Sequence, residues 1–458
     1  MVQMEKVETG TTVKIRCKTW SGEITQEGIM LPATAEGYIT LKLVNGYNVS
    51  YQKEMLLEME IINKPATNKV EEKISVQNVS TNLPLVTIIH TGGTIASKVD
   101  YETGAVVARF EPEELLAANP EIGNIARIET IKLGNMWSDD IRPTHWNKMI
   151  EATKIAFQNG SKGIVIAHGT DTMHISAAAL AFAWSGNKEK APGRIVFTGS
   201  QRSSDRGSSD ASENLLAATY WAAYGPPNTG EMGDSTVIVM HANSSDGGCV
   251  VLPGVNSRKN HSTKRAAFQA VNSKSLANIS INKDEINLEI NEEYLALKNK
   301  REICIDPKPY DLKLKIAQLV SGPHLTKDMV THAIDKEYSG IVFSGTGLGH
   351  LPIHNPTGDS PENPKLAEEI REYISRGGIA VMTTQCINGP INMNVYSKGR
   401  DQQEIGILGQ QTTNSIETAS VKLLWMLSNI PEGENKSEWI RDNWSGNLVG
   451  ENPLSLKD

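Results

Sequence analysis

Hydrophobic and polar residues follow two different patterns along the chain, and the pattern changes near residue 83. Over residues 1–62, short β-type runs such as TVKIRCK and GYITLKLV alternate with turn residues, including the hairpin signal Asn45-Gly46. This pattern predicts a small β-barrel. Residues 63–82 are rich in Asn, Lys, Glu and Ser with few apolar residues, which is typical of a linker.

Beyond residue 83 the apolar runs become continuous, as in LVTIIH, GIVIAH, RIVFTG and STVIVMH, and helical stretches such as HISAAALAFAW separate them. Continuous Val/Ile runs with intervening helices predict an α/β fold with a mainly parallel sheet covered on both faces. A second set of runs, including GIVFSGTGLG and GIAVMTTQ, follows an irregular stretch at about 286–312. We expect an α/β domain with the active site over residues 83–290 and a smaller α/β domain over residues 310–440.

Composition and charge restrict the function. The formal net charge of −8 argues against a general electrostatic grip on nucleic acid or on an anionic membrane. Four cysteines lie far apart, without a CxxC pair or a His/Cys cluster at metal spacing, so we predict no metal site and a reducing compartment. The sequence shows no signal-peptide pattern, and its apolar runs are all well short of the ~18 residues that a membrane span needs. We therefore expect a cytoplasmic protein.

Two threonine motifs come directly after apolar runs. TGGTIA, which begins at Thr91, follows LVTIIH, and GTDTM, which contains Thr170 and Asp171, follows GIVIAH. Because the carboxyl ends of parallel strands meet at one edge of a sheet, both motifs should converge on one crevice. A threonine hydroxyl there can act as a nucleophile if a base lies nearby. Taken alone, TGGT could equally be a turn whose threonines cap a following helix.

The two motifs resemble the two signatures of the L-asparaginase/glutaminase amidohydrolase family, over roughly residues 83–430. The resemblance implies hydrolysis of a carboxamide through an acyl-enzyme, with Thr91 as the nucleophile. It also implies that Thr170 works with Asp171 and a distant lysine, whose amine must lose its proton to act as a base.

The segment SRKNHSTKRAAF resembles the lysine-bearing loop of this family. Alignment on Phe268 places the family lysine at Lys259, and Lys264 is the competing choice. A solvated basic loop is the alternative without catalytic meaning. The tract SQRSSDRGSSD, residues 200–210, is open to two interpretations, an anion-binding loop or a Gly/Ser-rich loop at a strand end.

Two further residues match the family at single positions. Tyr101 corresponds to a tyrosine on a mobile loop that closes over the site and assists the first nucleophile; a simple lid or packing role is the alternative. Ser138, in NMWSDDIRPTHW, corresponds to a serine that binds the α-carboxylate of the substrate. Otherwise Ser138 would be a helix N-cap ahead of Arg142-Pro143.

The N-terminal segment GIMLPATAEGYITLKLVNGYNVSY resembles the barrel of one subfamily, the D subunits of archaeal glutamyl-tRNA(Gln) amidotransferases. That resemblance implies a glutaminase that supplies ammonia to a partner E subunit, which converts Glu-tRNA(Gln) to Gln-tRNA(Gln). No cofactor is then expected in this chain, because ATP and Mg belong to the partner, which also makes most contacts with tRNA(Gln). The family further implies a homodimer core within a heterotetramer.

Charge favours protein docking as the role of the barrel. Residues 1–62 carry six Lys and Arg against eight acidic residues, whereas a barrel that reads RNA would normally present a basic face. Two rival functions remain. One is a free-standing L-asparaginase/glutaminase with an accessory domain, since Asn and Gln differ by one methylene, worth only ~1–3 kcal/mol in a pocket. The other is an amino-acid sensor, which would have no use for both a nucleophile and a proton relay.

Overall fold

The computed structural model describes residues 7, 10–19, 22–31, 37–43, 48–63, 82–93, 95, 97–99, 106–108, 119–202, 208–282, 285–298 and 300–454. Tyr101 lies outside the described residues. Within them, no helix is both long and apolar enough to cross a bilayer.

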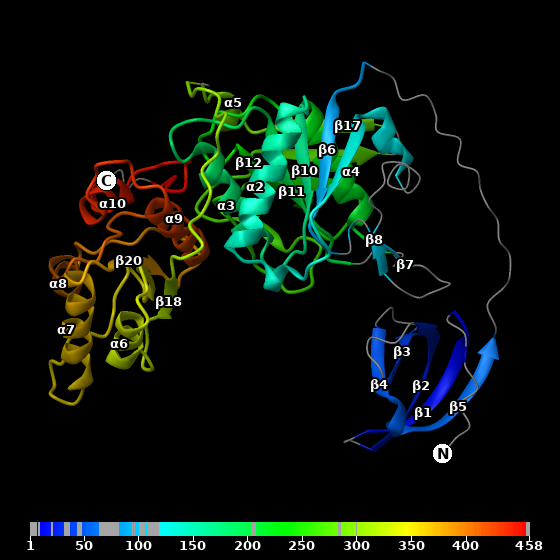
Figure 1. Cartoon of the computed structure of the whole chain (residues 1–458), viewed down its shortest axis with the longest axis horizontal. Helices are drawn as coiled ribbons and strands as arrows, with labels where there is room; N and C mark the ends of the chain where they lie inside the picture. The colour runs from blue at the N-terminus through cyan, green and yellow to red at the C-terminus, as the bar shows by residue number, and fades with distance from the viewer. Residues whose placement is uncertain are drawn as a thin grey trace.

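The N-terminal strands form a five-stranded antiparallel sheet in the order β4-β3-β2-β1-β5 (Figure 1). Its strands are β1 (Thr12–Thr19), β2 (Gly22–Leu31), β3 (Tyr38–Leu43), β4 (Asn48–Gln52) and β5 (Leu56–Asn63), with the 3-10 helix η1 (Lys53–Met55) before β5. Alternate residues of β1, Val13, Ile15 and Cys17, are buried against Ile39 and Leu41. Side chains two apart on a strand share a face, so the alternating pattern of the sequence builds this core.

An eight-stranded sheet follows, in the order β17-β16-β13-β12-β11-β10-β6-β9. Neighbours from β9 to β12 are parallel, and β13, β16 and β17 add antiparallel pairs. The irregular stretch expected from about 286 begins later, because β17 and a short helix occupy its first residues. The elements are β6 (Leu85–His90), β9 (Arg127–Lys132), β10 (Gly163–Ala167), β11 (Arg194–Thr198), β12 (Thr236–His241), β13 (Gly248–Pro253), β16 (Ala277–Asn282), β17 (Glu285–Ile290) and α5 (Glu292–Leu295).

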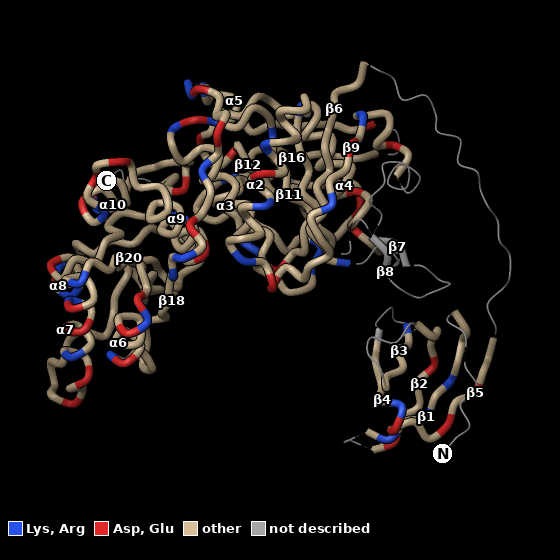
Figure 2. The backbone as a smooth tube through the Cα atoms, viewed as in Figure 1, with Lys and Arg blue, Asp and Glu red and all other residues tan. Residues whose placement is uncertain are grey.

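Helices cover both faces of this sheet, as the continuous apolar runs predict. Strand β10 is buried throughout: Ile164 and Ile166 belong to the cluster on the face of α2 (Pro143–Gln158) and α3 (Met173–Ser185), and Val165 belongs to the cluster on the face of α4 (Ala211–Tyr224). Strands β6, β10 and β12 contain no Lys, Arg, Asp or Glu, whereas helices further along the chain carry charges of both signs (Figure 2).

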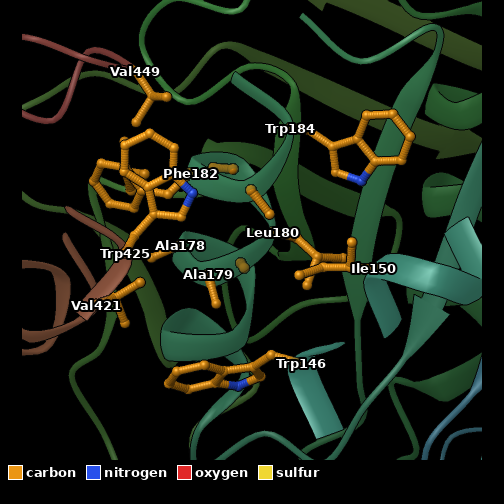
Figure 3. Packing of buried hydrophobic residues seen from close by; sticks show 14 of the residues in the cluster. Trp146, Ile150, Ala178, Ala179, Leu180, Phe182, Trp184, Val421, Trp425 and Val449 are labelled. Carbon is orange, nitrogen blue, oxygen red and sulfur yellow. The ribbon is translucent and has the colours of Figure 1, made fainter. Parts of the chain in front are cut away.

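The C-terminal part is a three-stranded parallel sheet, β18-β19-β20, with helices on both faces. Helix α9 packs on β18 and β19 and also on α3. Both α/β parts therefore share one hydrophobic cluster (Figure 3). In this cluster the ring centroids of Phe182 and Trp425 lie 6.3 Å apart. The elements are β18 (Ile316–Val320), α6 (Lys327–Asp335), β19 (Gly340–Gly345), α7 (Glu362–Ser375), β20 (Ile379–Thr384), α8 (Ser397–Ile405), α9 (Ile416–Ser428) and α10 (Lys436–Trp444).

A buried ion pair fastens the last described segment to α9. The Lys422 ammonium lies 2.6 Å from Glu451, and both side chains are fully buried. Lys422 also donates to the Trp444 and Gly446 carbonyls, and Glu451 accepts backbone N–H groups from Leu448 and a neighbour. Burial lowers the pKa of Lys422, and Glu451 opposes that shift. Each charge is therefore stable in the core only because the other is present.

Glu451→Gln should destabilise the protein by about 3 kcal/mol, because Lys422 then keeps a buried charge without a counter-ion. The measurement is the free energy of unfolding in denaturant. Glu362→Gln, which breaks the exposed Lys365–Glu362 pair, is the control and should change little. If Glu451→Gln lowers the free energy of unfolding no more than this control does, the buried pair does not stabilise the fold.

Candidate active site

Three backbone turns, which follow β6, β9 and β10, meet at the carboxyl edge of the parallel strands. One follows β6 and holds Gly92 and Gly93, whose φ angles are +139° and +82°. A β-carbon on Gly92 would lie 2.0 Å from the Met136 carbonyl oxygen, and one on Gly93 would lie 3.0 Å from the Gly169 nitrogen. Only glycine fits such conformations and contacts without strain. The two threonine motifs therefore abut each other, as parallel strands predict.

Thr91 is held between the two strands that carry the motifs. Its backbone N–H and its hydroxyl both donate to the Ala167 carbonyl, each at 3.1 Å, and the residue is 1 % exposed. Because the hydroxyl is the donor, its oxygen lone pairs stay available. The segment after TGGTIA is a strand, β7 (Ser97–Val99), which pairs with β8 (Val106–Ala108). The helix-capping alternative for TGGT is therefore wrong.

The second motif meets Lys259. The Lys259 ammonium lies 2.8 Å from the Thr170 hydroxyl and 2.8 Å from the Asp171 carboxylate. Its side chain is 9 % exposed, whereas that of Asp171 is 68 % exposed. The lysine is on β14 (Ser257–Lys259), which pairs with β15 (Phe268–Ala270). Lys264, the competing choice, is exposed in the connection between these strands.

Ser138 lies beside the second motif. It is buried and begins the 3-10 helix η3 (Ser138–Asp140), and its carbonyl accepts the Thr172 hydroxyl at 2.5 Å. A β-carbon on Gly169 would lie 2.9 Å from the Ser138 β-carbon. Helix α2 begins later, at Pro143 with Arg142 as its N-cap, so Ser138 is not the N-cap of that helix. A second 3-10 helix, η2 (Pro120–Asn124), precedes β9.

A buried histidine, His168, contacts the backbone of the turn that holds Gly169. Nδ1 of His168 lies 2.6 Å from the Gly169 carbonyl and Nε2 lies 3.0 Å from the Ser176 hydroxyl. Since a carbonyl can only accept, Nδ1 carries the proton and Ser176 donates to Nε2. Trp146 in turn donates to the Ser176 oxygen at 3.1 Å. Burial lowers the pKa of His168 to about 4, so the ring is neutral at pH 7.

The loop at residues 200–210 binds one of its own carboxylates. Asp210 is buried and accepts the backbone N–H groups of Gln201 and Arg202 at 3.0 and 2.9 Å, and the Asn214 amide at 3.0 Å. These donors are the ones that an external anion would need. Of the two interpretations of this tract, the described residues favour the strand-end loop.

Glu213, His241 and Asp246 bring three possible metal-ligand atoms within 4.8 Å of one another. The Arg265 guanidinium lies among them, 2.6 Å from Asp246 and 4.0 Å from Glu213. Arg265 therefore supplies the positive charge that a metal ion would bring. Burial and the neighbouring Arg265 lower the pKa of His241.

Comparison with known proteins gives one consistent family. Residues 85–294 match the model "Asparaginase, N-terminal" and residues 315–439 match "Glutaminase/Asparaginase C-terminal domain". The thermostable L-asparaginase from Thermococcus kodakarensis superposes with a TM-score of 0.63 at 28% identity, covering 80% of this chain and 98% of that one.

Two relatives match the chain over nearly its whole length. The D subunit of the glutamyl-tRNA(Gln) amidotransferase of Pyrococcus furiosus is 36% identical over 454 residues, which are 98% of this chain and 96% of the relative. The corresponding protein of Saccharolobus islandicus is 37% identical over 456 residues, 99% of this chain and 94% of the relative. The asparaginase models begin at residue 85, whereas these two relatives also match the part of the chain that holds the N-terminal sheet.

The free energy of unfolding should fall as the pH drops from 6.5 to 4. His168 takes up a proton near pH 6.5 in the unfolded chain but only near pH 4 in the folded chain, so acid favours unfolding across this window. His90 and His174 share the lowered pKa of about 4. For His168 alone the loss is on the order of 3 kcal/mol at pH 4.

His168→Asn should therefore unfold with a weaker pH dependence between pH 4 and 6.5 than the unchanged chain. Denaturant titrations at several pH values measure this slope. His324→Asn is the matched control, because His324 is exposed and should leave the slope unchanged. Equal slopes in His168→Asn and in the unchanged chain would contradict the neutral, buried state of His168.

Proposed function

This chain belongs to the family of glutamyl-tRNA(Gln) amidotransferase D subunits, and from that membership we propose that it hydrolyses glutamine at Thr91 and supplies ammonia for amidation of Glu-tRNA(Gln). The observation that carries the proposal is the Lys259 amine, within 2.8 Å of both Thr170 and Asp171 at the sheet edge where Thr91 lies. A nucleophile and a proton relay at one edge are what amide hydrolysis needs.

Thr91 supplies the nucleophile. Its oxygen attacks the side-chain carboxamide carbon of glutamine while its hydroxyl proton passes to the relay; the C–N bond breaks, the relay gives a proton to the departing NH2 group, and ammonia leaves. An ester then joins Thr91 to the glutamyl group, and water cleaves it to glutamate. The glycines beside Thr91 let the substrate come close to the backbone.

Thr170, Asp171 and Lys259 form the relay. When neutral, the Lys259 amine accepts the Thr170 proton across the 2.8 Å contact, and the Asp171 carboxylate orients the amine on its other side. Ser138 would bind the α-carboxylate of glutamine, and Tyr101 would close over the site and assist Thr91.

The partner is an E subunit that holds ATP and Mg and makes most of the contacts with tRNA(Gln). Support comes from relatives that are matched along 96% and 94% of their length and are named as subunits of such an amidotransferase. The N-terminal sheet, outside the asparaginase models, would dock the partner, and a homodimer core within a heterotetramer would carry two glutaminase sites. All four cysteines are free thiols, which suits a cytoplasmic location.

Thr91→Ala should abolish ammonia release from glutamine, and Lys259→Met should lower it by at least about 100-fold, because general acid–base catalysis contributes on that scale. Ammonia is measured with glutamine or asparagine, with and without the E subunit, ATP and Glu-tRNA(Gln). Lys264→Met is the matched control, an exposed lysine in the same hairpin. It should keep the activity of the unchanged chain.

The proposal expects weak glutaminase activity in the lone chain and a sharp rise in the full mixture. Vigorous asparagine hydrolysis by the lone chain, indifferent to partner and tRNA, would instead identify a free-standing asparaginase. If the unchanged chain and Thr91→Ala both bind glutamine and neither releases ammonia, the protein is a sensor.

A further inference from the structure

The strand that carries Lys259 is anchored from behind by an ion pair. Successive side chains of a strand point to opposite faces, so Arg258 leaves β14 on the side away from Thr170. Its guanidinium lies 2.9 Å from the carboxylate of Glu417, in the first turn of α9. We propose that the Arg258–Glu417 pair positions Lys259 against Thr170, and thereby couples the α9 region to ammonia release. This inference rests on the proposed glutaminase function.

The carboxylate in this pair has a fixed place. Glu417 is largely buried, with 16 % of its side chain exposed, and α9 is capped by Ser415, whose hydroxyl accepts the Thr418 N–H at 3.2 Å. A carboxylate in the first turn of a helix is also stabilised by the helix dipole. The backbone of Glu417 is therefore fixed by its own helix, and Arg258 pairs with one oxygen of its carboxylate.

Other contacts tie the same hairpin to the C-terminal part of the chain. The Thr418 hydroxyl donates to the Val255 carbonyl at 2.9 Å, next to the start of β14. After β15, the Asn272 amide donates to the Thr413 carbonyl at 2.9 Å and its oxygen accepts the Gly389 N–H at 2.7 Å. Both ends of the hairpin are thus anchored outside the eight-stranded sheet.

The front of the hairpin rests on the helix that follows the second threonine motif. Phe268 is the cross-strand partner of Lys259, and its ring packs edge-on against His174 with 6.4 Å between centroids. His174 lies in the first turn of α3, directly after that motif. The hairpin therefore contacts α3 through Phe268 and α9 through Arg258.

The test measures kcat and KM for glutamine in the full-length chain with its E subunit, ATP and Glu-tRNA(Gln). Arg258→Gln and Glu417→Gln should each lower kcat by about tenfold to 100-fold, with KM changed by less than about twofold, because a small misplacement of a catalytic group costs this much. The double variant should be no worse than either single variant, since both remove one contact. Arg258→Lys should recover part of the lost rate.

The control is Glu372→Gln, which breaks an exposed pair of 2.6 Å between α7 and Arg376, the C-cap of that helix, and should leave kcat unchanged. Thermal unfolding of each variant shows whether the fold is kept. Unchanged kcat in both single variants would overturn the inference. The inference would also be overturned if the two single variants changed kcat in opposite directions and the double variant restored it. That result would mean that the charges act on the site through space and not by positioning Lys259. Absence of ammonia release from the unchanged complex would instead refute the proposed glutaminase.

Discussion

The close approach of three backbone turns at the carboxyl edge of the parallel strands is the constraint on which the site depends. Gly92, Gly93 and Gly169 sit where an added β-carbon would meet backbone or side-chain atoms at 3.0 Å or less. Without these glycines the turns would have to move apart, and Thr91 and Thr170 with them. Backbone packing therefore sets the positions of the candidate catalytic threonines.

The sheet edge supplies Thr91, Thr170 and Asp171, but Lys259 comes from a hairpin outside that sheet. This division has a physical cause. Parallel strands that end at one edge bring short side chains together there, and the long side chain of Lys259 can reach them from a neighbouring hairpin. The hairpin is anchored by helices from both α/β parts, which share one hydrophobic cluster. The site is thus a property of the whole α/β region.

Much of this arrangement could be predicted from the sequence. Continuous apolar runs identify buried strands such as β10, and the rule that parallel strands end together brings Thr91 near the Thr170 motif. The supporting residues could not be predicted. In the sequence His168 is one of several scattered histidines, and Arg258 and Arg265 are only charges in a basic loop. Their partners, Glu417 and Asp246, are set by tertiary packing, which no periodicity or spacing encodes.

The buried Lys422–Glu451 pair has a consequence for the order in which the chain folds during synthesis. Helix α9 carries Lys422 into the core shared with α3, but the residue that neutralises it is made 29 positions later in the sequence (451 − 422 = 29). Until Glu451 has left the ribosome, burial of α9 places an unpaired charge in an apolar environment. Stable burial of α9 therefore depends on a residue made near the end of synthesis, and so does the anchor that α9 gives to the hairpin of Lys259.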